Sequence, residues 1–179
     1  TEGFDIVSGG RHHLKFWTIE GRCLNSRFPI VSTTQELGTL LCGARHGKVL
    51  ATGTATGDII VWSGRKFDRR FRAHEKGVVV MNTTSTELVT GSKDGMIKVW
   101  SIKFEHLKSF QLSTALVSPI LPAIRSVHAG ITITSQSSSL TNILVATASS
   151  EVYEIAYQSG NMTLIAVSHN IQVSYLREL

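Results

Sequence analysis

The seven histidines are the side chains of this 179-residue chain that could most readily bind a metal ion. A metal site needs three or four ligands that converge at about 2 Å, and a spacing such as HExxH presents two of them together. His12 and His13 are adjacent and the other five histidines are scattered singly, so no such spacing occurs. We therefore predict no metal site and no cofactor, and we expect His74 and His169 to have structural roles.

Serine, threonine and glycine are abundant, but none lies in a context that activates a nucleophile or binds phosphate. The chain has no GxSxG turn, which would expose a catalytic serine, and no GxxxxGK[ST] loop, which would cradle phosphates. Glycines such as Gly9 and Gly10 instead lie in predicted turns. The sequence therefore predicts no catalytic residue and no enzymatic activity.

The most basic stretch, residues 65–72, carries five positive charges and one negative charge. It is the best candidate surface for an acidic partner. The candidate partner-binding residues are Arg65, Lys66, Arg69, Arg70 and Arg72. On a strand, alternate side chains point to opposite faces, so the arginines would be divided between two faces. One face would hold Phe67, Arg69 and Phe71, and the other Asp68, Arg70 and Arg72.

A second explanation of this basic run needs no partner. Charged residues on an exposed edge strand discourage one sheet from pairing with another, so such a run is also expected at the outer edge of a sheet. The net charge of +5 and the isoelectric point near 9.5 favour acidic partners without choosing among nucleic acid, lipid headgroups and acidic protein tails. The sequence leaves both explanations open.

The overall composition is that of a folded globular domain. Hydrophobic residues make up 42% of the chain and charged residues 17%, which excludes a disordered protein. No apolar stretch approaches the roughly 20 residues that cross a bilayer, and we see no signal sequence, so we predict a cytoplasmic protein without a membrane partner. Cys23 and Cys42 lie 19 residues apart, and we interpret them as reduced thiols.

A strand–turn–strand pattern at Glu87–Ser101 recurs along the chain. A β-rich run from Leu88 precedes the turn residues Lys93–Gly95, and a second β-rich run ends at Trp100. Gly95 suits this turn because it adopts positive φ without a Cβ clash. The same outline recurs at Lys48–Ser63 and Asp5–Thr18, and in a degenerate form at Asn142–Ile155.

Three tryptophans and one isoleucine share a position when the repeats are aligned on their turns. They are Trp17, Trp62, Trp100 and Ile155, with successive spacings of 45, 38 and 55 residues. A period near 40 residues indicates an array of four-stranded repeats, each of which needs its neighbours to bury a face. We therefore expect the tryptophans in the core, which leaves few aromatic side chains to stack on bases and argues against nucleic-acid binding.

The predicted strands number three in the first repeat, four in each of the next three repeats and one at the end. The repeats occupy residues 1–34 (partial), 35–74, 75–114 and 115–168, and a further repeat begins at 169–179. We predict Arg27–Ser32 as the outer strand of the first repeat and Ile171–Leu176 as the first strand of the further one. A Ser-rich loop within Ile131–Asn142 explains the longest spacing and could carry a phosphorylation site.

The motif Gly91-Ser-Lys-Asp-Gly-Met-Ile-Lys-Val-Trp100, with His74 lying 26 residues before Trp100, resembles the WD-repeat β-propeller family. This resemblance implies an all-β fold of about four blades, each a four-stranded antiparallel sheet. It also implies a hydrogen-bonded chain within the repeat, formed by His74, Thr90 or Ser92, Asp94 and Trp100. Asp58 is only an approximate counterpart of Asp94, and the first and fourth repeats lack the aspartate.

The strand count allows two arrangements of such blades. Either the chain is an arc of a larger ring, or its last strand completes the first repeat and closes a small ring of four. We favour the arc, because rings of this repeat type more often have about seven blades.

A second resemblance covers nearly the whole chain. Gly9–Gly21, Ala51–Trp62 and Ala73–Gly77 look like successive blades of the echinoderm microtubule-associated protein-like family, and Pro122–Val127 and Val167–His169 follow in the same order. The resemblance implies a microtubule-associated scaffold whose complete form carries two joined propellers. The chain departs from the family in lacking its hydrophobic signature segment and an N-terminal coiled coil for oligomerisation.

Two functions are consistent with these features. The first is a non-catalytic scaffold that binds tubulin and microtubules through loops and a basic surface, as the resemblance implies, so that salt should weaken the binding. The second is a general WD-repeat scaffold that assembles other proteins without contacting tubulin. Binding that is insensitive to salt would favour the second function.

Overall fold

The computed structural model describes residues 4–32, 36–112, 123–133 and 138–167. These residues form fifteen β-strands and no α-helix, which confirms the all-β prediction. None of them lies in a helix long and apolar enough to cross a membrane. The chain divides into two compact units, Thr1–Val78 and Val79–Leu179, which are described separately below.

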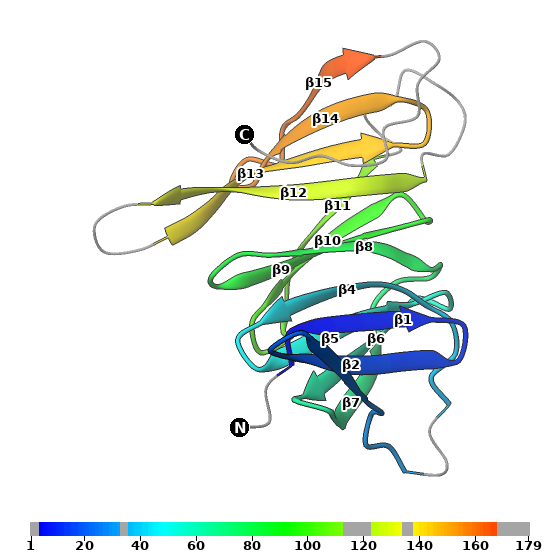
Figure 1. Cartoon of the computed structure of the whole chain (residues 1–179). Helices are drawn as coiled ribbons and strands as arrows, with labels where there is room; N and C mark the ends of the chain where they lie inside the picture. Colours follow the sequence, from blue (N-terminus) through cyan, green and yellow to red (C-terminus); the bar gives the residue numbers. More distant parts are fainter. Residues whose placement is uncertain (1–3, 33–35, 113–122, 134–137, 168–179) are drawn as a thin grey trace. The chain divides into compact units, whose positions relative to one another are not determined.

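The first unit contains two antiparallel sheets (Figure 1). The first sheet has the order β1-β2-β3, and the second has the order β4-β5-β6-β7. The strands of the first sheet are β1 (Ile6–Gly10), β2 (His13–Glu20) and β3 (Cys23–Arg27). Those of the second sheet are β4 (Leu40–His46), β5 (Val49–Thr54), β6 (Asp58–Ser63) and β7 (Lys66–Arg72).

Aromatic side chains join these two sheets. The Phe16 ring lies 6.2 Å from the Trp62 ring at an interplanar angle of 67°, and 4.8 Å from the Phe4 ring. Such edge-to-face contacts add to the stabilisation that burial provides. Leu14, Leu40, Leu50 and Ile60 complete the buried cluster. The repeat position of Trp62 is therefore a core position, because its side chain is 0% exposed.

The second unit contains two four-stranded antiparallel sheets, in the orders β11-β10-β9-β8 and β12-β13-β14-β15. The third sheet consists of β8 (Val78–Thr83), which begins at the boundary between the units, β9 (Glu87–Ser92), β10 (Met96–Ser101) and β11 (His106–Gln111). The fourth consists of β12 (Ile124–Ile133), β13 (Ser138–Thr147), β14 (Glu151–Ala156) and β15 (Met162–Val167). The prediction of one three-stranded and three four-stranded sheets is confirmed.

Glycine allows the third and fourth sheets to approach closely. A Cβ atom on Gly91 would lie only 2.7 Å from Ile124 Cγ2 and 2.8 Å from Val80 Cγ1. Around this contact the two sheets share a core whose members include Ile97, Val99, Ile143, Val145 and Ile155, each 0% exposed. The apolar runs of the sequence are therefore the facing sides of neighbouring sheets.

Two strand predictions were wrong. The outer strand of the first sheet is Cys23–Arg27, not Arg27–Ser32, because the chain reverses at Gly21 (φ 62°) and Glu20 pairs directly with Cys23. The Ser-rich stretch was predicted as a loop, but Ser138 and Ser139 pair with Ile133 and Thr132 and extend the β12–β13 hairpin. Residues 134–137 and the predicted strand Ile171–Leu176 lie outside the described residues.

Candidate functional site

A tryptophan–hydroxyl hydrogen bond recurs in three of the four sheets. The tryptophans lie on β2, β6 and β10. In each case the indole Nε1 donates to a hydroxyl group on the preceding strand, which is β1, β5 or β9. The pairs are Trp17 with Ser8 at 2.8 Å, Trp62 with Thr52 at 3.0 Å and Trp100 with Thr90 at 3.0 Å. In the fourth sheet the corresponding residue is Ile155, which packs in the apolar core instead.

In the third sheet the structure identifies the hydroxyl that the sequence left open. Thr90, which is 0% exposed, accepts the Trp100 indole proton. The Ser92 hydroxyl instead accepts the backbone N–H of Asp94 at 3.2 Å, and Asp94 Oδ1 accepts the N–H of Met96 at 2.9 Å. Asp94 and Ser92 therefore hold the β9–β10 turn, while Thr90 fixes the indole ring.

His74 lies in the first unit and is only 2% exposed. Its backbone N–H donates to the carbonyl oxygen of Gly57 at 2.9 Å, which ties the segment after β7 to the β5–β6 turn. Gly57 has φ 99°, and a Cβ atom there would lie 2.3 Å from the His74 carbonyl oxygen. The hydrogen-bonded chain from His74 through Thr90 to Trp100 stays a prediction.

The adjacent histidines lie at the first hairpin. His12 occupies the turn with φ 49°, and His13 Nε2 lies 3.3 Å from Ser8 Oγ, the acceptor of the Trp17 indole. Within the described ranges, no three His, Cys, Asp or Glu side chains are grouped so that they could hold a metal ion. His13 thus extends a hydrogen-bonded network in the first sheet, a role that the sequence analysis did not predict.

The basic run forms β7, the outer strand of the second sheet. Its pairing with β6 shifts register between Val61 and Trp62, so that Trp62 pairs with Phe67 while Ile60 pairs with Arg70. Paired residues point to the same face, and the Trp62 and Phe67 rings lie 5.8 Å apart. Phe67 therefore shares a face with Arg70, and the prediction that it shares one with Arg69 was wrong, because the bulge at Asp68 reverses the alternation.

Arg70 and Arg72 converge on Asp58, the first residue of β6. Arg70 donates to Asp58 Oδ2 from Nε at 3.0 Å and from Nη2 at 2.5 Å, and Arg72 Nη1 lies 3.6 Å from Oδ1. Thr56 Oγ1 donates to Oδ2 at 3.1 Å. Arg72 also donates to the carbonyl oxygens of Thr56 and Glu75. These two arginines therefore bind their own sheet.

The environment of Asp58 keeps its carboxylate ionised. Partial burial opposes ionisation and raises the pKa, but the hydrogen bonds from Arg70 and Thr56 and the charges of both arginines outweigh it. The net effect is a pKa below the usual value of 3.8. Asp58 thus neutralises part of the positive charge that the sequence assigned to this strand.

The other basic residues of the run are arranged differently. Arg65 Nη1 donates to the carbonyl oxygen of Phe28 at 3.0 Å, which leaves its charge without a carboxylate among the described residues. Lys66 is exposed at the start of β7. Arg69 Nε lies 3.8 Å from Asp68 Oδ2, with both side chains about half exposed, and a pair of this kind contributes little. Arg65, Lys66 and Arg69 are therefore the part of the run best placed for an external acidic group.

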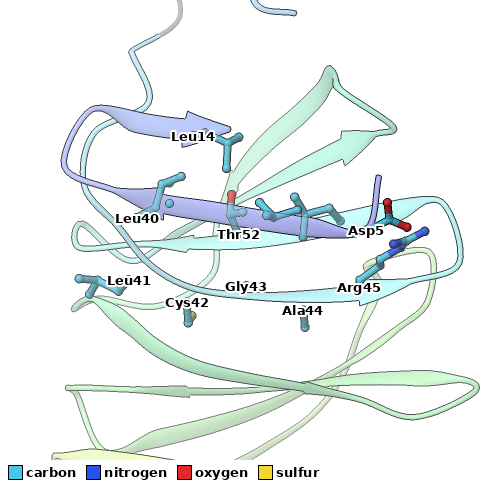
Figure 2. Close-up of a pocket in the computed structure, with 12 residues that line it drawn as sticks. Asp5, Leu14, Leu40, Leu41, Cys42, Gly43, Ala44, Arg45 and Thr52 are labelled. Carbon is cyan, nitrogen blue, oxygen red and sulfur yellow. The ribbon is translucent and has the colours of Figure 1, made fainter. Parts of the chain in front are cut away.

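A pocket of about 340 Å³ lies between the first and second sheets (Figure 2). Val7 and Gly9 of β1 line it, together with the length of β4 from Leu40 to Arg45. Arg45 Nη1 donates to the carbonyl oxygen of Phe4, next to Asp5, so one end of the otherwise apolar pocket is charged.

Cys42 lines this pocket, and both cysteines are free thiols. The Cys42 thiol donates to the carbonyl oxygen of Val78 at 3.3 Å. Burial raises its pKa to about 12, although a backbone hydrogen bond at Gly53 acts in the opposite direction. Cys23, in contrast, is exposed on β3. Cys42 is therefore unreactive as a nucleophile, because the thiolate is the reactive form.

Comparison with known proteins shows which proteins these sheets resemble. The WD40 family (WD domain, G-beta repeat) matches residues 65–101, from the basic strand to the end of β10. The sheets are the blades of a WD-repeat β-propeller. Over 115 residues the WD-repeat chain is 30% identical to "Echinoderm microtubule-associated protein-like 1" of Homo sapiens, and equally to the proteins of that name from Mus musculus and Rattus norvegicus. The resemblance to the echinoderm microtubule-associated protein-like family is thereby confirmed.

The match covers 60% of the WD-repeat chain and 14% of each of these relatives. Solved structures support the fold. "Structure of U3-55K" gives a TM-score of 0.72 at 16% identity, covering 93% of this chain and 49% of that one. The computationally designed Ika8 protein gives 0.61 at 22% identity, with coverages of 87% and 44%, and RRP9 WD40 repeats give 0.65 at 18%, with 88% and 46%. The WD-repeat chain therefore spans slightly less than half of each solved propeller.

Proposed function

We propose that this WD-repeat chain is part of a non-catalytic, cytoplasmic scaffold that binds microtubules, as an arc of a larger propeller. The observation that carries the proposal is the 30% identity to proteins named for microtubule association. The net charge of +5 supports it, because the tubulin surface is acidic. The half-length match to solved propellers supports the arc.

The contact surface in this proposal is the outer strand of the second blade. Arg65, Lys66 and Arg69 present positive charge there, while Arg70 and Arg72 hold Asp58 and contribute a smaller net charge. Exposed charges of this kind steer an acidic partner and set the orientation of the complex, and salt screens them. Binding to microtubules should therefore weaken as the ionic strength rises.

A second candidate is a WD-repeat scaffold that assembles other proteins without contacting tubulin. The matched WD40 family region supports this alternative as well as the first. The apolar pocket beside β4 favours it in one respect, because a peptide held there would bind through contacts that salt does not screen. Salt sensitivity therefore separates the two candidates.

Co-sedimentation with polymerised microtubules over a salt series tests the proposal. The variant Lys66→Glu/Arg69→Glu removes charge from the proposed surface without disturbing Asp58, unlike changes at Arg70 or Arg72. Its matched control is Lys48→Glu/Lys93→Glu, which alters the net charge equally at two exposed lysines elsewhere. Circular dichroism verifies that all of the variants are folded.

We expect the wild type and the control to pellet with microtubules at low salt, and the Lys66→Glu/Arg69→Glu variant to lose most of its binding. Equal loss in both variants would mean that net charge alone governs binding and that the β7 surface has no special role. If the folded wild type does not pellet at any salt concentration, the tubulin proposal fails and the general scaffold is favoured.

A further inference from the structure

The β5–β6 turn of the second blade has the same internal geometry as the β9–β10 turn of the third blade. Each turn comprises the five residues between the last paired positions of its strands, 54–58 and 92–96. The fourth residue is a glycine with positive φ in both, and its N–H donates to the carbonyl oxygen of the first residue at 3.2 Å. The third residue is Asp94 in the third blade and Thr56 in the second. A hydroxyl therefore occupies the position that holds a carboxylate in the third blade.

Two hydroxyl groups lie in the β5–β6 turn, and they differ in accessibility. Thr54 is 1% exposed, whereas Thr56 is an exposed residue. The Thr56 hydroxyl lies 2.9 Å from the Thr54 hydroxyl and donates to Asp58 Oδ2 at 3.1 Å. Of the two, the Thr56 hydroxyl is therefore the one that an enzyme acting on this turn could reach.

Two arginines of β7 flank Thr56. Arg70 Nη2 lies 3.5 Å from Thr56 Oγ1, and Arg72 Nη1 donates to the backbone carbonyl oxygen of Thr56. Both guanidinium groups also reach the Asp58 carboxylate, at 2.5 Å for Arg70 and 3.6 Å for Arg72. Guanidinium groups bind phosphate as readily as carboxylate, and a phosphate offers them three strong acceptor oxygens. The two arginines are therefore placed to hold a phosphate group attached to Thr56.

A phosphate at this position would reverse the local charge. Arg70, Arg72 and Asp58 together carry one net positive charge. Phosphorylation of a threonine adds about two negative charges at neutral pH. The phosphate would also repel the Asp58 carboxylate, because Asp58 Oδ2 lies only 3.1 Å from the oxygen that would carry it. Both effects favour transfer of the arginines from the carboxylate to the phosphate.

We propose that Thr56 is a phosphorylation site whose phosphate takes Arg70 and Arg72 from Asp58. A protein kinase transfers the γ-phosphoryl group of a nucleoside triphosphate to Thr56 Oγ1. The bond between the γ-phosphorus and the bridging oxygen breaks and leaves with the nucleoside diphosphate, a bond from phosphorus to Oγ1 forms, and the hydroxyl proton passes to the kinase or to solvent. The modification is independent of the proposed microtubule function, because it concerns ion pairs within the second blade.

Phosphopeptide mapping tests whether the hydroxyl is modified. The folded chain is incubated with a human cell extract and ATP and is then digested with trypsin, which releases the peptide 49–65. We expect fragmentation of this peptide to locate a phosphate on Thr56, and we expect the phosphate to disappear in Thr56→Val. A peptide without phosphate, or with its phosphate on the exposed Ser63 instead, would overturn the proposal.

Urea unfolding tests the exchange of partners. Phosphothreonine is genetically encoded at position 56, and the modified and unmodified chains are each compared with and without Asp58→Asn. In the unmodified chain, Asp58→Asn should lower the urea midpoint. In the phosphorylated chain this loss should disappear, because the arginines then hold the phosphate and Asp58 only repels it. An equal loss in both chains would mean that Asp58 keeps its arginines and that the proposed exchange is wrong.

Phosphothreonine at position 86 is the matched control. Thr86 is also exposed in a turn, but its hydroxyl donates to Glu87 Oε2 at 2.6 Å, so a phosphate there would face a carboxylate. The loss caused by Asp58→Asn should persist in this control. If it disappears there as well, added negative charge alone explains the effect and the assignment of the arginines to Thr56 fails.

Phosphorus NMR of the folded protein provides an independent measurement. A nearby positive charge favours the doubly ionised phosphate and lowers its second pKa. Arg72→Gln should therefore raise the second pKa of the phosphate on Thr56 and leave that of the phosphate on Thr86 unchanged. Arg72 is 57% exposed, and circular dichroism verifies that the variant is folded. A pKa at Thr56 that does not respond to Arg72→Gln would contradict a contact between this arginine and the phosphate.

Discussion

Asp58→Asn is the most informative single substitution, because Asp58 is the point at which two arginines of the basic strand meet. The change keeps the size of the side chain and removes its charge. In the wild type, Oδ2 accepts two hydrogen bonds from Arg70, and Arg72 lies 3.6 Å from Oδ1. The Asp58 side chain is only 15% exposed, so solvent replaces these interactions poorly when the charge is lost.

The expected cost follows from these contacts. A hydrogen bond to a charged group contributes about 1.5 to 3 kcal/mol when it is shielded, whereas an exposed ion pair contributes about 0.2 to 1 kcal/mol. Arg70 is 36% exposed and Arg72 is 57% exposed, which moves the value toward the lower range. We expect Asp58→Asn to lower the free energy of unfolding by about 1 kcal/mol at pH 7, or roughly 2 to 4 °C in Tm.

The cost of Asp58→Asn should depend on pH in a definite direction. The folded-state pKa of Asp58 lies below the unfolded-state value, so its charge stabilises the fold above the unfolded-state pKa. That stabilisation declines as the pH falls through the folded-state pKa, because the carboxylate becomes protonated in both states. The difference between the wild type and Asp58→Asn should therefore be largest near neutral pH and should disappear in acid, as urea unfolding at several pH values would show.

Asp68→Asn is the matched control on the same strand. Asp68 is 55% exposed and its ion pair with Arg69 is 3.8 Å long, so its loss should change the unfolding free energy by less than about 0.5 kcal/mol. Equal effects of the two substitutions, or a cost at Asp58 that does not change between pH 7 and acid, would refute the assignment of Asp58 as the internal partner of the two arginines.

Three further predictions concern the blades themselves. Thr90→Val leaves the buried Trp100 indole N–H without its acceptor and should lower the free energy of unfolding, measured in urea, by about 1 to 3 kcal/mol. Ser8→Ala, which removes the acceptor of the partly buried Trp17 indole, should cost less. Equal costs would contradict the role of burial. Gly57→Ala should destabilise by more than about 1 kcal/mol, because its φ is 99° and its Cβ would meet the His74 carbonyl, whereas Gly10→Ala, with no atom within 4 Å, should be nearly neutral. In the native protein at pH 8, iodoacetamide should label the exposed Cys23 but not Cys42, because burial raises the pKa of the Cys42 thiol to about 12. Both cysteines should react in urea. Labelling of Cys42 in the native protein would count against its burial.

The hairpins could be predicted from sequence because their turns carry local signals. Gly57 and Gly95 adopt positive φ as the turn chemistry requires, and the strands on either side begin and end within a residue or two of the predicted bounds. The error in the first blade also had a local signal. Glu20-Gly21-Arg22-Cys23 forms a two-residue loop with positive φ at Gly21, whereas the predicted outer strand began only at Arg27.

The candidate site was harder to predict, because its geometry depends on pairing between strands. The bulge at Asp68 lies between two paired positions of β6 and moves Phe67 to the face of Arg70. No pattern within residues 65–72 indicates such a bulge, since it depends on the fit of Phe67 against Trp62. The partnership of Asp58 with Arg70 and Arg72 has the same origin. The sequence suggested Asp58 only as an approximate counterpart of the turn aspartate, whereas its position opposite Arg72 makes it an ion-pair partner.

The basic strand therefore contains two groups of residues with different surroundings. Arg70 and Arg72 stabilise the second blade from within, so their conversion to acidic residues would lower stability and binding together and could not test a contact with tubulin. Arg65 donates to a backbone carbonyl oxygen, Lys66 is exposed, and the Arg69 Nε atom lies 3.8 Å from Asp68 Oδ2 with both side chains about half exposed. Because only their charges are available to an acidic partner, the electrostatic attraction should correspond to about three charges and not to the five that the run contains. A salt dependence much steeper than this would indicate that other basic surfaces of the chain take part in binding.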